Sequence, residues 1–265
     1  MKLRSLALWL LLAAFSNGTI LAQDWAKERL NKSPRHSEWV DLKHGDRTVK
    51  AFVVYPEVKT KAPVVLVIHE IFGLTDWAKT LADELAAAGY IAIAPDLLSA
   101  PGKDTQSYPD QGAAIKAVSA LQNMQIFSDL DAAADYAMKM PASNGKLAVT
   151  GFCWGGGKSF AYANHNPYLK AAFVFYGPGP ESAADAARIA CPVYGFYGED
   201  DARINAMIPQ TKEIMQKAGK TFEPIIYPGA GHGFMRAGEA PDASEANRKA
   251  RDAAWERWKS LLKNL

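Results

Sequence analysis

The chain has 265 residues, and its 30 lysines and arginines against 28 aspartates and glutamates give a formal charge of +2. Residues 1–22 hold two of the bases and none of the acids, so the rest of the chain is formally neutral. A neutral chain with scattered basic residues gives no reason to expect nucleic acid or an anionic membrane surface as a partner. The length suits one large domain with a complete core, and we expect residues 23–265 to form it.

The N-terminus has the pattern of a secretory signal peptide. Lys2 and Arg4 precede an almost unbroken apolar run over 6–15, and Ala22 offers a small residue at a plausible cleavage point. The apolar run is short for a membrane span, and an uncleaved N-terminal anchor is the alternative. We therefore predict a signal peptide over residues 1–22, a periplasmic or secreted location, and no membrane contact after cleavage.

Predicted strands and helices alternate along the rest of the chain. The β-rich segment 48–55 alternates as an outer strand does, and Ser128 with Asp131 resembles a capping box at the start of a helix. Apolar runs predict strands over 48–55, 63–68, 90–94, 146–150, 171–175, 193–197 and 222–227. Helical spacing and end signals predict helices over 76–88, 111–121, 128–140, 156–164, 208–218 and 243–262.

This alternation predicts an α/β fold with a doubly wound, mostly parallel sheet and helices on both faces. Ligands of such sheets bind beyond the carboxyl ends of the strands. Four residues with reactive side chains fall at or just after these ends, namely Glu70, Cys153, Asp201 and His232. We expect them to meet at one edge of the sheet.

The segment GFCWG at 151–155 has the form of a nucleophile elbow with cysteine at its centre. It lies between a short apolar strand and a possible helix, and its glycines leave room for the strained backbone that pushes the nucleophile outwards. The alternative is a glycine-rich turn with a buried structural cysteine. We expect Cys191, which precedes a proline at the start of a strand, to be buried rather than bridged to Cys153.

A base and an acid follow the elbow in the chain. His232 lies in a glycine-rich loop after the last predicted strand, and we interpret it as a catalytic base. Asp201 lies in a loop directly after a strand, where a carboxylate can orient the imidazole; Asp200 is the competing candidate, and either could instead cap the loop. The order Cys153, Asp201, His232 is the nucleophile–acid–base order of the α/β-hydrolase fold.

Two backbone N–H groups and one further carboxylate complete the predicted site. The N–H of Trp154, which follows the nucleophile, and that of Ile71 are candidates for an oxyanion hole. Glu70 would oppose a thiolate on Cys153 through like-charge repulsion. We interpret it as a residue that controls when the thiolate forms; a solvated loop acid or a helix cap is the alternative.

Three segments together resemble the dienelactone hydrolase family (carboxymethylenebutenolidases): GFCWGG at 151–156, HEIFG at 69–73 and GHGF at 231–234. The resemblance extends from about Phe52 to the C-terminal helix. It implies an α/β-hydrolase fold, with Glu70 holding and releasing the thiol. It further implies a triad of Cys153, Asp201 and His232 and an oxyanion hole from Ile71 and Trp154.

Arg236 resembles a family arginine that pairs with the carboxylate of the substrate, and a guanidinium suits this task, although the residue could equally lie on the surface. One departure concerns 95–102, which has no arginine where the dienelactone enzymes carry a second one; Lys103 is near but not equivalent. The N-terminal leader is a second departure. Both favour hydrolysis of some ester or lactone over dienelactone itself.

We therefore predict a carboxylic ester hydrolase that opens a small-molecule ester or lactone by two-step acyl transfer through a thioester. Aromatic residues could line its pocket or simply pack in the core: Phe72, Trp77, Tyr108, Trp154 and Phe234. No dinucleotide fingerprint, phosphate-binding loop or zinc motif appears, so we expect no cofactor and no metal. A monomer is our expectation. The alternatives are a thiol acyltransferase or peptidase on the same fold, and a binding protein without catalysis.

Overall fold

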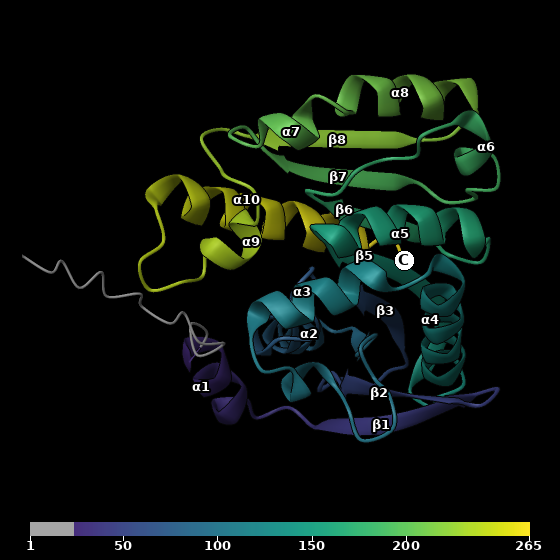
Figure 1. Ribbon diagram of the computed structural model, residues 1–265, viewed down its shortest axis with the longest axis vertical. Coiled ribbons are helices and arrows are strands. Elements are labelled where there is room, and N and C mark those ends of the chain that lie inside the picture. Colours follow the sequence, from purple (N-terminus) through teal and green to yellow (C-terminus); the bar gives the residue numbers. More distant parts are fainter. Residues whose placement is uncertain (1–23) are drawn as a thin grey trace, which may run out of the picture.

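The computed structural model describes residues 24–265, so the predicted signal peptide lies outside the described residues. These residues form an eight-stranded sheet with the strand order β1-β2-β4-β3-β5-β6-β7-β8 and helices on both faces (Figure 1). Strands β3 to β8 are parallel, whereas β1 and β2 are antiparallel to their neighbours. The prediction of a mostly parallel α/β sheet is confirmed.

The strands are β1 (Ser37–His44), β2 (Arg47–Val54), β3 (Ala62–Ile68), β4 (Ile91–Pro95), β5 (Ser143–Phe152), β6 (Ala171–Phe175), β7 (Val193–Gly198) and β8 (Phe222–Tyr227). The longer helices are α1 (Asp24–Lys32), α2 (Asp76–Ala87), α3 (Gln111–Ala120), α4 (Asn123–Met138), α5 (Trp154–His165), α8 (Ile208–Lys217) and α10 (Glu245–Leu262). Single turns form η2 (Thr105–Ser107), α6 (Ala183–Ala186), α7 (Ala202–Asn205) and α9 (Phe234–Ala237).

Two apolar layers hold the helices to the sheet. On one face α1, α2, α9 and α10 pack on the sheet around Trp77 and Trp258, which are fully buried. On the other face α4, α5 and α8 cover a layer that includes Leu66 and Val149. The central strands are buried on both faces, and burying one large apolar side chain contributes roughly 1.5–3 kcal/mol. The core therefore fixes the central strands, whose ends carry the candidate site.

Two predictions about single elements were wrong. The strand over 48–55 is not at the edge, because the unpredicted strand β1 pairs with β2 and forms the edge itself; β1 is half exposed and reads weakly as a strand. Helix α4 begins at Asn123, so Ser128 lies inside the helix and caps nothing. The apolar face of α4 already starts at Ile126, which is fully buried, and packing overrides the local capping signal.

No helix within residues 24–265 is both long enough and apolar enough to cross a bilayer.

Candidate active site

Five parallel strands end at the same edge of the sheet, and a residue with a functional side chain follows each of them closely. Glu70 follows β3, Cys153 follows β5, and Tyr176 follows β6. Asp201 comes three residues after β7, and His232 follows β8. The four predicted positions thus lie at one edge of the sheet, as the parallel topology requires.

The backbone around Cys153 is a sharp turn between β5 and α5. Cys153 has φ 55° and ψ −116° and precedes the first residue of α5. Such a conformation costs a non-glycine residue about 1–3 kcal/mol. The flanking glycines permit it, because a Cβ at Gly151 would lie 1.9 Å from the oxygen of Gly155, and one at Gly155 would lie 2.3 Å from the oxygen of His69.

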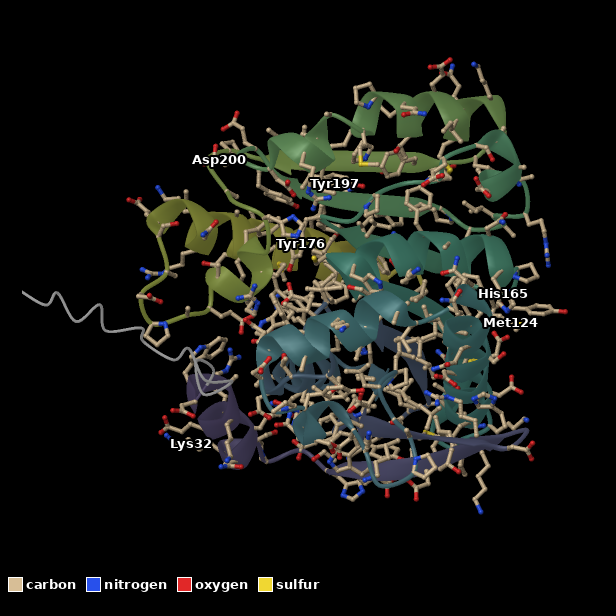
Figure 2. All side chains as sticks on the ribbon, viewed as in Figure 1. Lys32, Met124, His165, Tyr176, Tyr197 and Asp200 are labelled. Atoms are coloured by element: carbon tan, nitrogen blue, oxygen red, sulfur yellow. The ribbon has the colours of Figure 1, made fainter. Side chains whose placement is uncertain are left out.

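His232 pairs with Asp201 and not with Asp200. The carboxylate Oδ2 of Asp201 bonds Nδ1 of His232, and its Oδ1 accepts a hydrogen bond from the N–H of Ile204 at 3.4 Å. Asp201 is thereby both the partner of the imidazole and the cap of α7. Asp200 lies on the outer edge of the molecule beside α7 (Figure 2).

The imidazole of His232 also interacts electrostatically with the candidate nucleophile, Cys153. Hydrogen bonding with Cys153, and then with Asp201, raises the pKa of His232 to about 9, although partial burial opposes this shift. The raised pKa favours the protonated form of the ring, the imidazolium. An imidazolium beside the sulfur of Cys153 stabilises a thiolate, and an N–H of the imidazolium can protonate a leaving group.

Glu70 forms an ion pair with Arg236. Nε of Arg236 donates to Oε2 of Glu70 at 2.7 Å, and the guanidinium lies 5.2 Å from the ring centre of Phe72. The Glu70 side chain is only 3% exposed, whereas that of Arg236 is 31% exposed. The structure thus joins two residues that the sequence placed in separate roles. Removing one charge of such a pair leaves the other buried without compensation.

The loop after β3 and the start of α5 bring the two candidate oxyanion donors to neighbouring strand ends. The carbonyl of Glu70 accepts hydrogen bonds from Nδ1 of His69 at 2.7 Å and from the N–H of Gly73 at 3.2 Å, which fixes the turn that contains Ile71. The N–H of Trp154 belongs to the first turn of α5, where amides lack partners within the helix. The rings of His69 and Trp154 stack at 5.7 Å and connect the two segments.

Tyr176 is a site residue that the sequence analysis missed. Its backbone has φ 39°, and its ring lies edge-on to that of His232 at 5.1 Å and to that of Phe234 at 5.4 Å. Its hydroxyl is buried without a hydrogen-bond partner among the described residues, and burial raises its pKa well above the usual range. Its place directly after an apolar strand, before Gly177 and Pro178, was the available signal.

Two of the predicted pocket aromatics belong to the core instead. Trp77, predicted to bind substrate, is fully buried and packs edge-on against Phe152 at 5.2 Å. Phe234 is also fully buried. Trp77 faces the sheet, because α2 packs on the sheet through this side chain, and Phe234 packs behind the ring of Tyr176 instead of lining a pocket. Phe72 and Trp154 stay partly exposed at the strand ends.

Both cysteines are free thiols, and Cys191 is buried. Within residues 24–265 no group of three or more His, Cys, Asp or Glu side chains is arranged to hold a metal ion.

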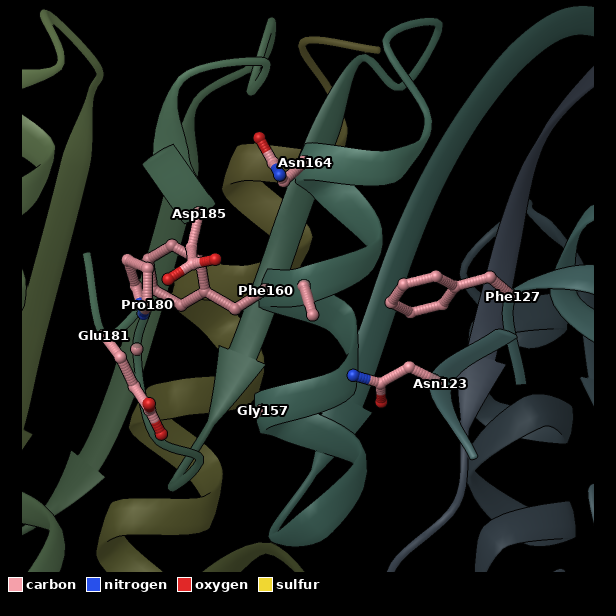
Figure 3. A pocket seen from close by; sticks show the side chains of 10 residues that line it. Asn123, Phe127, Gly157, Phe160, Asn164, Pro180, Glu181 and Asp185 are labelled. Atoms are coloured by element: carbon pink, nitrogen blue, oxygen red, sulfur yellow. The ribbon is translucent and has the colours of Figure 1, made fainter. Parts of the chain in front are cut away.

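A cavity of about 370 Å³ runs along α5 between α4 and the segment before α6 (Figure 3). It is lined by Asn123, Phe127, Gly157, Phe160, Ala161, Asn164, Gly179, Pro180, Glu181 and Asp185. None of the predicted site residues is among these lining residues of the described chain.

The parallel sheet, its helices on both faces and the sharp turn between the central strand β5 and α5 define an α/β-hydrolase fold. A sequence model described as "Dienelactone hydrolase family" matches residues 49–265. The chain belongs to the dienelactone hydrolase family, and it is a hydrolase of that kind.

Individual relatives agree with this assignment. A protein of Methylorubrum extorquens named "Putative carboxymethylenebutenolidase" is 37% identical over 200 residues, which cover 71% of this chain and 69% of the relative. A protein of the same name from Synechocystis is 30% identical over 238 residues, covering 84% and 94% of the two chains. A crystal structure from Klebsiella pneumoniae named "Putative Dienelactone Hydrolase" superposes with a TM-score of 0.77 and 30% identity, covering 87% of this chain and 99% of that one.

Proposed function

We propose that the protein hydrolyses a carboxylic ester or lactone through a triad of Cys153, His232 and Asp201. The observation that carries this proposal is the imidazole of His232, which bonds Asp201 through Nδ1 and lies near enough to Cys153 for that residue to be the main cause of its raised pKa. A nucleophile, a base in contact with it and an acid that orients the base are the parts that acyl transfer needs.

In the proposed mechanism His232 takes the proton of the Cys153 thiol, and the resulting thiolate attacks the carbonyl carbon of the substrate. The N–H groups of Ile71 and Trp154 stabilise the oxyanion of the tetrahedral intermediate. The intermediate collapses to a thioester, and the departing oxygen takes its proton from the imidazolium of His232. Neutral His232 then removes a proton from water as the water attacks the thioester, and the imidazolium returns this proton to the departing sulfur, which restores the thiol. With a lactone the departing oxygen stays within the acyl group, so one hydroxy acid is released.

Arg236 and Phe72 suit an anionic, unsaturated or aromatic substrate. The guanidinium of Arg236 is fixed by Glu70 through Nε and is partly exposed, and a guanidinium binds a carboxylate with two parallel hydrogen bonds. The ring of Phe72 stacks near this charge. We propose that Arg236 receives a carboxylate of the substrate while Cys153 attacks its ester or lactone carbonyl.

Steady-state hydrolysis of p-nitrophenyl acetate and of a cis-dienelactone tests the proposal. Cys153→Ala should abolish turnover of both substrates, whereas the matched control Cys191→Ala should keep it, because Cys191 is buried away from the site. Turnover of the simple ester alone would keep the mechanism and exclude dienelactone as a substrate. Wild-type protein without Cys153-dependent turnover of either substrate would overturn the proposal.

We also propose that residues 1–22 direct export of the chain. The basic start, apolar run and small residue at position 22 support this proposal. N-terminal sequencing of protein recovered from a periplasmic extract should begin near Gln23; a chain that still begins at Met1 and stays in the cytoplasm would contradict it.

A further inference from the structure

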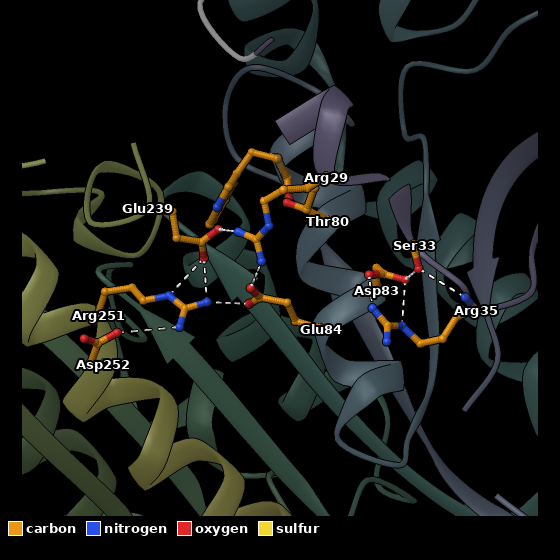
Figure 4. A network of polar contacts seen from close by, with 10 residues as sticks. Arg29, Ser33, Arg35, Thr80, Asp83, Glu84, Glu239, Arg251 and Asp252 are labelled. Atoms are coloured by element: carbon orange, nitrogen blue, oxygen red, sulfur yellow. Dashed lines mark hydrogen bonds and ion pairs between the residues drawn. The ribbon is translucent and has the colours of Figure 1, made fainter. Parts of the chain in front are cut away.

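Four alternating charges form a network that joins α1, α2 and α10 to the residues after α9 (Figure 4). Arg29 of α1 pairs with Glu84 of α2 and, at 2.6 Å, with Glu239. Arg251 of α10 contacts the same two carboxylates, at 2.5 Å for Glu84 and 2.8 Å for Glu239. The Glu239 and Glu84 side chains are only 5% and 14% exposed, whereas Arg29 is 45% exposed, so the two carboxylates are largely buried and Arg29 covers them from the surface.

The network holds the end of α9. Glu239 comes two residues after α9, and its N–H donates to the carbonyl of Arg236 at 3.2 Å. Gly238 lies close to α10, because a Cβ there would come within 2.5 Å of the oxygen of Asn247. A helix of one turn has little stability of its own, so its place depends on what its ends contact.

The other contacts of α9 lead into the site. Arg236 lies within α9 and makes the ion pair with Glu70. Phe234 begins α9 and packs against Tyr176, whose ring in turn packs against His232. A displacement of α9 would therefore move the guanidinium beside Glu70 and loosen the support of the imidazole.

Helix α1 lies outside residues 49–265, the part of the chain that the family model matches. We propose that α1 is a positioning element of the active site: through Arg29 and Glu239 it holds α9, and thereby Arg236, in register with Glu70. The proposal rests on the proposed function, because only that function makes the surroundings of Cys153 an active site. Its test, however, does not require turnover.

The charge count explains why Arg29 matters. Without it, Glu84 and Glu239 share the single guanidinium of Arg251, and two carboxylates in a poorly hydrated place repel each other. We expect this repulsion to displace Glu239 rather than Glu84, because Glu239 follows the single turn of α9, whereas Glu84 lies within the longer helix α2. When Arg236 moves away, the negative charge of Glu70 near Cys153 is no longer compensated.

Alkylation of Cys153 by two reagents measures this change. Iodoacetate is an anion and iodoacetamide is neutral, so the ratio of their rates at Cys153, followed by peptide mass spectrometry, reports the local charge. In Arg29→Met we expect the iodoacetate-to-iodoacetamide ratio to fall by about five-fold. Arg29→Lys should restore most of it, because an ammonium still pairs with a carboxylate. Lys32→Ala is the matched control, since Lys32 lies on the same helix, is exposed and pairs only with Glu28 among the described residues (Figure 2).

An unchanged ratio in folded Arg29→Met would overturn the proposal. This holds also where both alkylation rates rise by the same factor, because an equal rise signifies general loosening of the site and not a change of its local charge. If Arg29→Met does not fold, Glu239→Gln is measured instead and should lower the ratio in the same direction; an unchanged ratio there contradicts the proposal too. Failure of the proposed function appears separately, as wild-type protein without Cys153-dependent turnover.

Discussion

The two halves of the candidate site are held by different kinds of contact. Cys153 and the loop of Ile71 follow the central strands β5 and β3, where close approaches between backbone segments fix them. His232 and Arg236 follow the edge strand β8. The loop before His232 also lies against backbone, since a Cβ at Gly198 would come within 2.4 Å of the oxygen of Ala230, but the two side chains are oriented by distant partners, Asp201 and Glu70. The nucleophile half is thus specified by a local motif, while the other half depends on residues far apart in the sequence.

The largest effect is expected from a substitution in the half of the site that contains Cys153. Gly155→Ala places a Cβ 2.3 Å from the oxygen of His69 and 2.5 Å from that of Ile68, and neither backbone atom can yield easily. We expect a loss of more than about 4 kcal/mol in the free energy of unfolding, measured by thermal or urea unfolding. Gly145→Ala is the control: φ is +80° but the space is open, so about 1 kcal/mol is expected. A stable, active Gly155→Ala would refute the backbone account.

The acid of the other half comes next. Asp201→Asn keeps the shape of the side chain but removes the charge that orients and stabilises the imidazolium, so kcat/KM should fall by about 10³–10⁴. Asp200→Asn should stay within about two-fold of wild type, because Asp200 is exposed and does not contact the imidazole. Equal losses in the two variants would show that the pairing with Asp201 does not decide activity.

The half of the site that contains Cys153 could be predicted from the sequence better than the half that contains His232 and Arg236. The turn at Cys153 was predictable because its glycines and flanking apolar runs are local signals. The Glu70–Arg236 pair was not, since its members are 166 positions apart and nothing local joins them. Trp77 was misplaced because helical spacing does not tell whether an aromatic ring faces the sheet or a cleft. Helix α1 was not predicted at all, for it is short, polar and held largely by its contacts with α2.

The pH dependence sharpens the comparison, because His232 belongs to the half held by side chains. Its pKa is raised to about 9, so the imidazolium that we propose as the proton donor to the leaving group is lost as pH rises through this value. For an unactivated lactone, kcat/KM should therefore decline above about pH 9. In Asp201→Asn the descending limb should move to lower pH by about one unit or more, since the carboxylate that favours the cation is gone. A limb that does not move would contradict this assignment.

The smallest effect is expected at Tyr176. Its buried hydroxyl has no partner among the described residues, whereas its ring supports His232. Tyr176→Phe keeps the ring and should leave kcat/KM within about two-fold while raising the free energy of unfolding by up to about 1 kcal/mol. Enzyme assays and thermal unfolding of the same sample measure both. A hundred-fold loss of kcat with unchanged stability would show that the hydroxyl takes part in the reaction.

The central claim is a covalent acyl group on Cys153, and intact-protein mass spectrometry after rapid acid quenching of a reaction with p-nitrophenyl acetate tests it most directly. The account predicts a transient mass increase of one acetyl group, mapped by peptide analysis to Cys153, stable in acid and removed by hydroxylamine. The increase should be absent in Cys153→Ala and present in Cys191→Ala. Two results would contradict the account, each in protein whose steady turnover depends on His232. One is an acyl group on a residue other than Cys153, and the other is the absence of any acyl-enzyme, under all quench conditions, in both the wild type and Asp201→Asn.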